Sequence, residues 1–392
     1  MSWSSVNPER FYRPTAYFLL LTIVSFVVYA GMSFATHHVD DPSLLDRDES
    51  DYYNLAGNLI HNNYTFDLRR PPIHVLILCI LRILAFNNLR ATQVLVSLTF
   101  SLSGPMMYLL ARRIFGHNRL ALTIGAATIF WPPFLFYGNT LYSETTALPL
   151  FVLTLISIPP GSVIEPDAPG GQVRSSFAGM LLGLCILVRP MYLLFSPLAV
   201  AILFLEESKW SVAMRRAGLV TVGCLLVVLP WSAYITSKAG AQILVSANDG
   251  ETLGGGLNPT LIEKGYETSI TPDGRRTWFG PGKWLQESAT GYLNDDEQKL
   301  PYAERDVIMR RRAIAWIVHN PGSALRLQSA KLLYMWGLYP FWNGATQTFL
   351  GNVPTIALSI LSILSLVRFR HCLRKLSRFW FLPLFVSFCR AD

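Results

Sequence analysis

Charge and cysteine are scarce in this sequence. Of its 392 residues only 15% are Asp, Glu, Lys or Arg, whereas 51% are hydrophobic. A typical soluble domain carries about 25% charged residues. The low charge and high apolar content exclude a disordered chain, and five cysteines without a Cys-x-x-Cys pair exclude a disulfide-stapled secreted fold. The composition indicates a polytopic membrane protein.

The positive charges are not gathered on one polar face. The net charge is +8, but the Lys and Arg residues flank apolar runs, which is typical of cytoplasmic anchoring rather than of a nucleic-acid-binding surface. The first apolar run, Thr15–Phe34, follows Arg10 and Arg13 and has about the 20 residues that a span needs. We therefore expect a multi-pass protein of the cell (inner or plasma) membrane with a cytoplasmic amino terminus.

The run Ile73–Phe86 is not interpreted as a membrane span, because it is short and contains Arg82. A span needs about 20 apolar residues, so this run fits an interfacial helix better. If it crossed the bilayer, Arg112 and Arg113 would lie outside. If it lies on the surface, these arginines lie inside, as the positive-inside rule prefers. We adopt the second interpretation.

The remaining apolar runs complete a predicted seven-helix module. One long run is broken by Arg189-Pro190 and is interpreted as a tight hairpin with Arg189 at its outer turn. The expected fold is thus an all-α polytopic membrane protein. Its further spans are expected at about residues 91–110, 120–137, 141–158, 177–205 (two helices) and 216–234.

Three regions follow from this layout. Residues 1–235 form the transmembrane catalytic module, with interfacial helices in a first outer loop at 35–90, and the polar residues 236–350 form an extracytoplasmic domain. Residues 351–392 are expected to form a short carboxy-terminal helical hairpin; its last run is short, so either it is not a full span or the carboxy terminus is incomplete. No internal repeat is evident, so an inverted-repeat transporter is not supported.

Ionisable residues of both signs are expected at one level, the outer membrane surface, and such residues are functional candidates. Arginine binds phosphate oxygens through paired charge-assisted hydrogen bonds, and a carboxylate can take the proton of an acceptor hydroxyl. Together they suit the transfer of a sugar from a lipid-linked phosphate, whose long chain stays in the bilayer. The candidates are Asp48, Glu49, Arg69, Arg70, Glu144 and Arg189.

Five short motifs occur in a recognisable order: Asp48-Glu49 followed by Tyr52 and Leu55-Ala56, Arg70-Pro71-Pro72, Ser143-Glu144, Gly183-Leu184 through Arg189-Pro190, and Pro230-Trp231. Their order resembles the GT-C superfamily of membrane glycosyltransferases. The dolichyl-phosphate-mannose protein mannosyltransferase-like and lipid A aminoarabinose transferase-like branch is the most similar. The chain departs from the family pattern after Pro71-Pro72, where it has Ile73-His74-Val75, and after Pro230-Trp231, where it has Ser232-Ala233.

The resemblance implies a role for each candidate. Asp48 would be the catalytic base, with Glu49 as a second catalytic candidate whose alternative role is a charge that favours the helix N-terminus. Arg189 would lie near the carrier phosphate, and Arg69 and Arg70 are weaker candidates for the same task. Support for the acceptor or the first-loop helices is expected from three further residues, Glu144, Asp51 and Tyr52.

The implied reaction moves a monosaccharide from a polyprenyl-phosphate carrier to an acceptor hydroxyl on the extracytoplasmic side, with inversion. The partners are the lipid-linked donor, a lipid, polysaccharide or protein acceptor, and the membrane, with no nucleic acid. No metal site is indicated, since His37-His38 with Asp40-Asp41 lack a defined third ligand, and assistance by a divalent metal stays open. The alternatives are a polyprenyl-lipid flippase or transporter, and a non-catalytic membrane scaffold.

Overall fold

The computed structural model describes residues 9–36, 42, 45, 47–61, 68–158, 169–206, 209–259, 267–270, 276–278 and 293–335. Within them the chain divides into two compact units, one of residues 9–61 and 71–231 and one of residues 68–70 and 232–335. The predicted carboxy-terminal hairpin and the His37-His38 and Asp40-Asp41 pairs lie outside the described residues.

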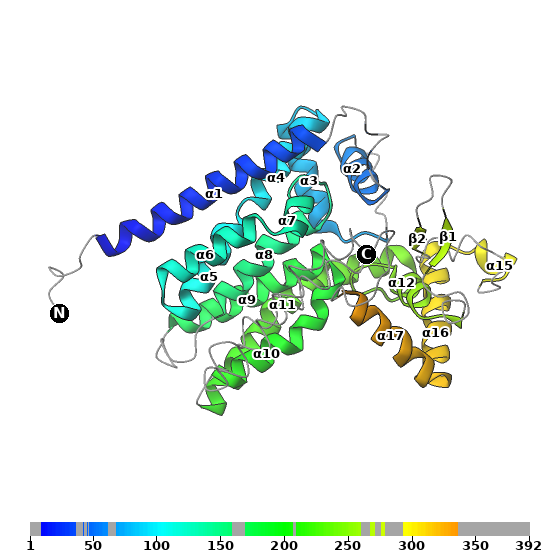
Figure 1. Ribbon diagram of the computed structural model, residues 1–392. Helices are drawn as coiled ribbons and strands as arrows, with labels where there is room; N and C mark the ends of the chain where they lie inside the picture. Colours follow the sequence, from blue (N-terminus) through cyan, green and yellow to red (C-terminus); the bar gives the residue numbers. More distant parts are fainter. Residues whose placement is uncertain are drawn as a thin grey trace. The chain divides into compact units, whose positions relative to one another are not determined.

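In its described residues the first unit consists of helices and their connections (Figure 1). Proline sets several boundaries, because it fixes the first-turn geometry and lacks the N–H that a helix interior needs: Pro72, Pro132 and Pro190 each open a helix. The helices are α1 (Glu9–Thr36), α2 (Arg47–Ile60), α3 (Pro72–Leu84), α4 (Leu89–Phe100), α5 (Ser103–Phe115), α6 (Asn118–Ile129), α7 (Pro132–Tyr137), α8 (Glu144–Ser157), α9 (Pro169–Val188), the 3₁₀ helix η3 (Pro190–Leu194), α10 (Phe195–Glu206) and α11 (Trp210–Ala239), whose last turns belong to the second unit.

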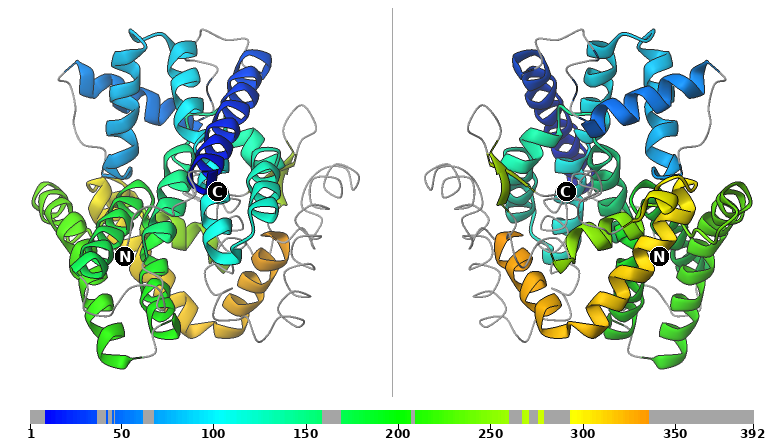
Figure 2. Two further views of the ribbon diagram at one scale, coloured as in Figure 1. Left: turned by 90° about the vertical axis from the view of Figure 1, so that its left-hand side faces the viewer. Right: turned by 90° about the vertical axis from the view of Figure 1, so that its right-hand side faces the viewer.

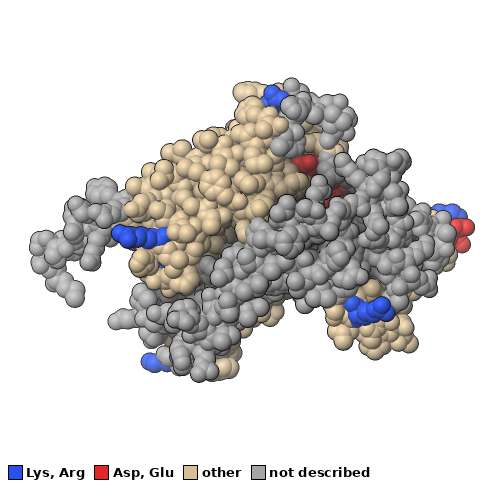
Figure 3. All heavy atoms as spheres, in the orientation of Figure 1, with Lys and Arg blue, Asp and Glu red and all other residues tan. Residues whose placement is uncertain are grey.

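Four helical segments of the described chain are long and apolar enough to cross a membrane: Pro14–Ala35, Leu89–Phe115, Gly171–Val188 and Trp210–Ala239. The outer side of the first one is apolar, with Leu19, Leu20, Ile23 and Val27 all more than half exposed. Figure 3 shows few described charged side chains over α1 and the helices beside it. The predicted membrane character is confirmed at this level, while the number and direction of crossings stay predictions.

Helix α1 packs along α4, α5 and α6, and α8 packs on α9 (Figures 1 and 2). The backbones of helices α9 and α11 also lie close together, because a side chain at Gly179 would collide with the carbonyl of Val220 and one at Gly223 with that of Ser176. Small residues let helix backbones touch in this way in membrane proteins.

Short helix α3 agrees with the predicted interfacial helix in position. One face of it is buried through His74, Val75, Leu78 and Arg82, and it packs on α2, α4 and α9. The break between α9 and η3 also lies where the sequence predicts it, at Arg189-Pro190.

The second unit combines helices with one β-hairpin. It contains α12 (Asp249–Gly256), β1 (Glu267–Ile270), β2 (Arg276–Trp278), α15 (Asp295–Gln298), α16 (Tyr302–His319) and α17 (Pro321–Met335). The strands pair antiparallel, with Ile270 opposite Arg276. The described chain is therefore helical as expected, apart from this one short hairpin, whose Thr, Ile and Trp residues favour strands.

Candidate functional site

Two adjacent carboxylates begin α2 and have different surroundings. Asp48 and Glu49 both lie in the first turn, where the helix dipole favours negative charge. Glu49 is only 4% exposed, and its Oε1 accepts a hydrogen bond of 2.7 Å from the backbone N–H of Leu141. Asp48 and Asp51 are half-buried. The Glu49 carboxylate is therefore hydrogen-bonded to the backbone of a loop that lies far away in the sequence. The sequence does not indicate this structural role.

Leu141 lies in the loop between α7 and α8, and both polar groups of its backbone are bound by side chains. Its N–H donates to Glu49 of α2, and its carbonyl accepts from Nε2 of His74 of α3 at 2.9 Å. With Nε2 donating, a neutral His74 ring accepts at Nδ1 from the hydroxyl of Thr146, 3.0 Å away. These bonds hold the loop that leads directly into α8.

Tyr52 supports this arrangement from α2. Its ring is buried and meets the ring of His74 edge-on, with centroids 4.7 Å apart and planes at 90°. The structure therefore places Tyr52 in the packing of the first-loop helices. His74 was missed as a site residue by sequence reasoning; the available signal was a lone histidine within an apolar run.

The structure brings Glu144 and Arg189 together. Arg189 has an extended backbone (φ −145°, ψ 123°) between α9 and η3, and its Nη1 forms an ion pair with Oε1 of Glu144, which begins α8. The Arg189 side chain is 13% exposed and that of Glu144 5%. Ser143 lies within 3.4 Å of both partners through its hydroxyl. Since a buried charge is costly unless it is paired, this pair explains how both residues are kept among apolar helices.

A continuous set of contacts joins three of the predicted site residues of the first unit, Glu49, Glu144 and Arg189. It runs from Glu49 on α2 to Leu141, along the chain to Ser143 and Glu144, and from there to Arg189. Three segments that lie far apart in the sequence thus bring two carboxylates and one arginine into one connected cluster. We call Glu49, Leu141, Ser143, Glu144 and Arg189 together the Leu141–Arg189 cluster.

Arg69 and Arg70 belong to the second unit. The preceding carbonyl, of Leu68, accepts a hydrogen bond of 2.6 Å from the N–H of Ala247, and the guanidinium of Arg69 lies 5.6 Å from the ring centroid of Tyr302. The structure therefore pairs Arg69 with an aromatic ring of α16. The predicted contact of these two arginines with a carrier phosphate stays a prediction.

The second unit has a polar cluster of its own, between α12 and α16, that sequence reasoning missed. The carboxylate of Asp306 accepts from the backbone N–H groups of Gly250 (2.9 Å) and Glu251 (3.0 Å), and so caps the start of α12 from another helix. The Tyr302 hydroxyl donates to Glu251. Burial is the main cause that raises the pKa of Tyr302, Asp306 and Asp249 above their ordinary values.

Metal binding finds no support in the described part of the chain, where no three His, Cys, Asp or Glu residues are grouped to hold an ion. No cofactor is established.

The chain is similar in structure to two solved glycosyltransferases. It is similar to ArnT from Cupriavidus metallidurans bound to undecaprenyl phosphate, at 16% identity and a TM-score of 0.46, over 95% of this chain and 76% of that one. It is also similar to the oligosaccharyltransferase of Archaeoglobus fulgidus, in its complex with Zn and sulfate (17% identity, TM-score 0.43, 95% of this chain and 48% of that one) and in its apo form (13%, 0.37, 91% and 56%). The chain thus spans about half the length of the archaeal enzyme.

No family model matches the chain, and no curated protein matches it in sequence. The motifs resemble the GT-C glycosyltransferases, and the structures to which the chain is similar are those of glycosyltransferases of that superfamily. With identities of 13 to 17% and TM-scores below 0.5, the likeness carries no residue role, donor or acceptor over to this chain. Those are argued from the site itself.

Proposed function

We propose that this chain is an integral-membrane glycosyltransferase that moves a monosaccharide from a polyprenyl-phosphate carrier to an acceptor hydroxyl on the extracytoplasmic side of the cell membrane. The observation that supports it best is the Leu141–Arg189 cluster, in which a buried arginine is paired with Glu144 and connected through Leu141 to Glu49, the residue that follows Asp48 in the first turn of α2. A phosphate ligand and a base are the two groups that this reaction requires.

The proposal assigns the base to Asp48 rather than to Glu49. Glu49 is 4% exposed and already holds the N–H of Leu141, so taking a proton from a substrate would disturb the loop that leads to Glu144. Asp48, one position earlier, is only half-buried and is therefore better placed to meet an acceptor. Glu49 then becomes a positioning residue, as does Tyr52.

The reaction follows from these positions. Asp48 takes the proton of the acceptor hydroxyl while the hydroxyl oxygen bonds to the anomeric carbon. The bond from that carbon to the phosphate oxygen breaks, and its electron pair leaves with the polyprenyl phosphate. A single displacement of this kind inverts the anomeric centre, as in single-step glycosidases.

Arg189 is proposed to stabilise the charge that develops on the leaving phosphate. A guanidinium carries five N–H donors in a rigid fork that matches phosphate oxygens. Glu144 fixes the orientation of this fork. Arg69 and Arg70 stay second candidates for phosphate binding, on the strength of the sequence alone.

The test is sugar transfer by purified protein reconstituted in sealed lipid vesicles, in which movement of the carrier lipid across the bilayer is followed as well. Undecaprenyl phosphate is the lipid of the ArnT structure, so sugars on that carrier are supplied first, together with an envelope extract as acceptor. Wild type is compared with Asp48→Asn, Asp51→Asn and Asp296→Asn. The last removes a carboxylate whose side chain is 94% exposed in the second unit and serves as the control.

Acid–base catalysis contributes about 100-fold or more, so we expect Asp48→Asn to lose at least ~100-fold in rate and Asp296→Asn to keep the wild-type rate. Loss in Asp51→Asn with normal transfer by Asp48→Asn would move the base to Asp51. If no protein transfers sugar while labelled carrier lipid crosses the membrane, the flippase alternative replaces the enzyme. A non-catalytic scaffold would neither transfer sugar nor move carrier lipid, and the three substitutions would leave it unchanged in both assays.

A further inference from the structure

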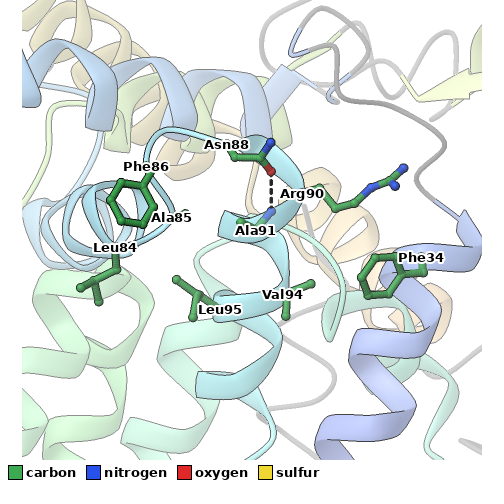
Figure 4. A pocket seen from close by; sticks show the side chains of 9 residues that line it. All are labelled: Phe34, Leu84, Ala85, Phe86, Asn88, Arg90, Ala91, Val94 and Leu95. Carbon is green, nitrogen blue, oxygen red and sulfur yellow. Dashed lines mark hydrogen bonds between the residues drawn. The ribbon is translucent and has the colours of Figure 1, made fainter.

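A pocket of 610 Å³ opens in the first unit, away from the Leu141–Arg189 cluster. It lies between the end of α1, the turn that joins α3 to α4, and the first turns of α4 (Figure 4). Its size falls in the range of about 300 to 1,000 Å³ that small-molecule sites occupy. Phe34, Leu84, Phe86, Val94 and Leu95 supply its apolar walls.

One cation is present among the residues that line this pocket in the described chain: Arg90, in the first turn of α4. Its side chain extends from α4 toward Phe34 of α1 (Figure 4), with the guanidinium carbon 5.7 Å from the ring centroid. The other polar residue, Asn88, accepts a hydrogen bond of 2.9 Å from the N–H of Ala91 and caps the helix. The pocket therefore complements a molecule with one negative charge and a hydrocarbon chain.

The α3–α4 turn presents apolar side chains outward. Phe86 and Asn87 have positive φ values of 51° and 59°, which bulky residues rarely adopt, and the Asn87 N–H bonds to the Arg82 carbonyl at 2.8 Å. As a result Phe86 is 93% exposed, while Leu84 on the same wall is 60% exposed. Apolar surface held out in this way is expected to meet hydrocarbon rather than water.

The position of the pocket along α1 indicates the depth in the membrane. Phe34 is 55% exposed and lies near the end of the apolar segment Pro14–Ala35. The end of a span lies at the headgroup region, where arginine and aromatic residues anchor it. A charge at Arg90 with apolar walls beside it therefore matches a lipid, with its phosphate at the surface and its chain in the bilayer.

We propose that this pocket binds an anionic glycerophospholipid, with the phosphate on Arg90 and one acyl chain against Phe34, Leu84, Val94 and Leu95. The single charge of a phosphodiester matches one arginine. A terminal phosphate monoester carries about −1.5 to −2 and would call for a second cation, which favours a phospholipid over a polyprenyl phosphate. This lipid site does not depend on the proposed transferase activity.

The experiment measures lipid binding to delipidated protein in mild detergent, by native mass spectrometry and by the rise in apparent Tm. Phosphatidylglycerol, phosphatidylcholine and undecaprenyl phosphate are titrated separately into wild type, Arg90→Gln, Arg90→Lys and Leu95→Trp. Arg119→Gln is the matched control, because Arg119 is an exposed arginine at the start of another helix, α6.

We expect phosphatidylglycerol to bind wild type more tightly than the other two lipids. Arg90→Gln should weaken it roughly tenfold or more, since a charge-assisted contact is lost, while Arg90→Lys and Arg119→Gln keep most of the affinity. Leu95→Trp, which fills the pocket, should also weaken binding. Equal binding of phosphatidylcholine, unchanged affinity in both Arg90→Gln and Leu95→Trp, or tighter binding of undecaprenyl phosphate at Arg90 would each overturn the proposal.

Discussion

Arg189 in the first unit and Lys331 in the second are both largely withdrawn from water, but they differ in their surroundings. Arg189 has Glu144 as a counter-charge. The Nζ of Lys331 lies where a side chain at position 256 would be, so that Gly256 makes room for it, and burial lowers the pKa of Lys331 to about 8. Arginine does not lose its proton in proteins, whereas a buried lysine does. The first unit therefore holds an arginine whose positive charge is permanent and paired, and the second holds a lysine that titrates.

The comparison also separates the acids of the two units. Glu49 of α2 binds one N–H of a loop, and Asp306 of α16 binds two at the start of α12. Both use a carboxylate to satisfy backbone donors of a distant segment. The segments that the two carboxylates bind are different. Glu49 binds Leu141, which lies just before the ion-pair partner of Arg189, whereas Asp306 binds the start of α12, a helix without a candidate catalytic residue.

The largest effect is expected from breaking the ion pair of the first unit. Glu144→Leu leaves Arg189 without this carboxylate, and loss of one partner of a buried pair costs about 3 to 5 kcal/mol. We expect a marked fall in apparent Tm together with loss of sugar transfer. The double variant Glu144→Leu with Arg189→Leu should regain part of the stability but no activity. Strictly additive losses in Tm would show that the pair is not coupled.

Lys331→Met removes a buried positive charge and should stabilise the protein, in contrast to Glu144→Leu, which should destabilise it. Lowering the lysine pKa from 10.5 to about 8 corresponds to a burial cost on the order of 3 kcal/mol at pH 7, so this variant should be more stable than wild type. Between pH 8 and 10.5 the unfolded state of wild type binds more protons, and its stability rises with pH. The gap in Tm between the two proteins should therefore shrink from pH 7 to pH 10. A constant gap would mean that the lysine is not the titrating group.

Glu49 offers a matched pair of variants. Glu49→Gln keeps an oxygen that can accept from the Leu141 N–H, while Glu49→Ala leaves this buried donor unsatisfied, at a cost of about 1 to 3 kcal/mol. We expect the Ala variant to lose stability and transfer rate and the Gln variant to keep most of both. Comparable loss in the two would point to a need for the charge itself, and Glu49 would return as the base.

The smallest effect is expected at an exposed pair of the second unit. Lys299 and Asp296 lie 3.1 Å apart, with side chains 75% and 94% exposed, so solvent and salt screen their attraction. Asp296→Asn should leave the apparent Tm unchanged within error. A clear fall would show that exposed ion pairs also stabilise this protein, so that burial would not explain the difference between Arg189 and Lys331.

Much of the fold could be predicted because it depends on local pattern. Apolar runs placed α1, α9 and α11, and the end of α16 at His319 follows from the Asn320-Pro321 signal. The β-hairpin was missed although its Pro-Asp-Gly turn signal is present in the sequence. A polar stretch without alternation over several residues gives a weak strand signal.

The candidate site was predictable as a set of residues but not as a set of contacts. Motif order selected Asp48, Glu144 and Arg189 before any contact was known. The hydrogen bond from the Leu141 N–H to Glu49 joins positions 92 residues apart. Hydrophobic periodicity along the sequence cannot predict a contact between positions so distant. His74 and Lys331 were missed for the same reason, since their environments arise only when distant helices pack.

The helical and membrane character of this protein, the proline breaks in its helices and the set of charged candidate residues can all be inferred from the amino-acid sequence. Hydropathy and backbone preference act over neighbouring residues, so they can be read along the chain. The pairing of Glu144 with Arg189 and the bond from Leu141 to Glu49 depend on how distant helices pack. A charge buried by packing must take whichever partner the fold brings to it, because water is no longer there to solvate it.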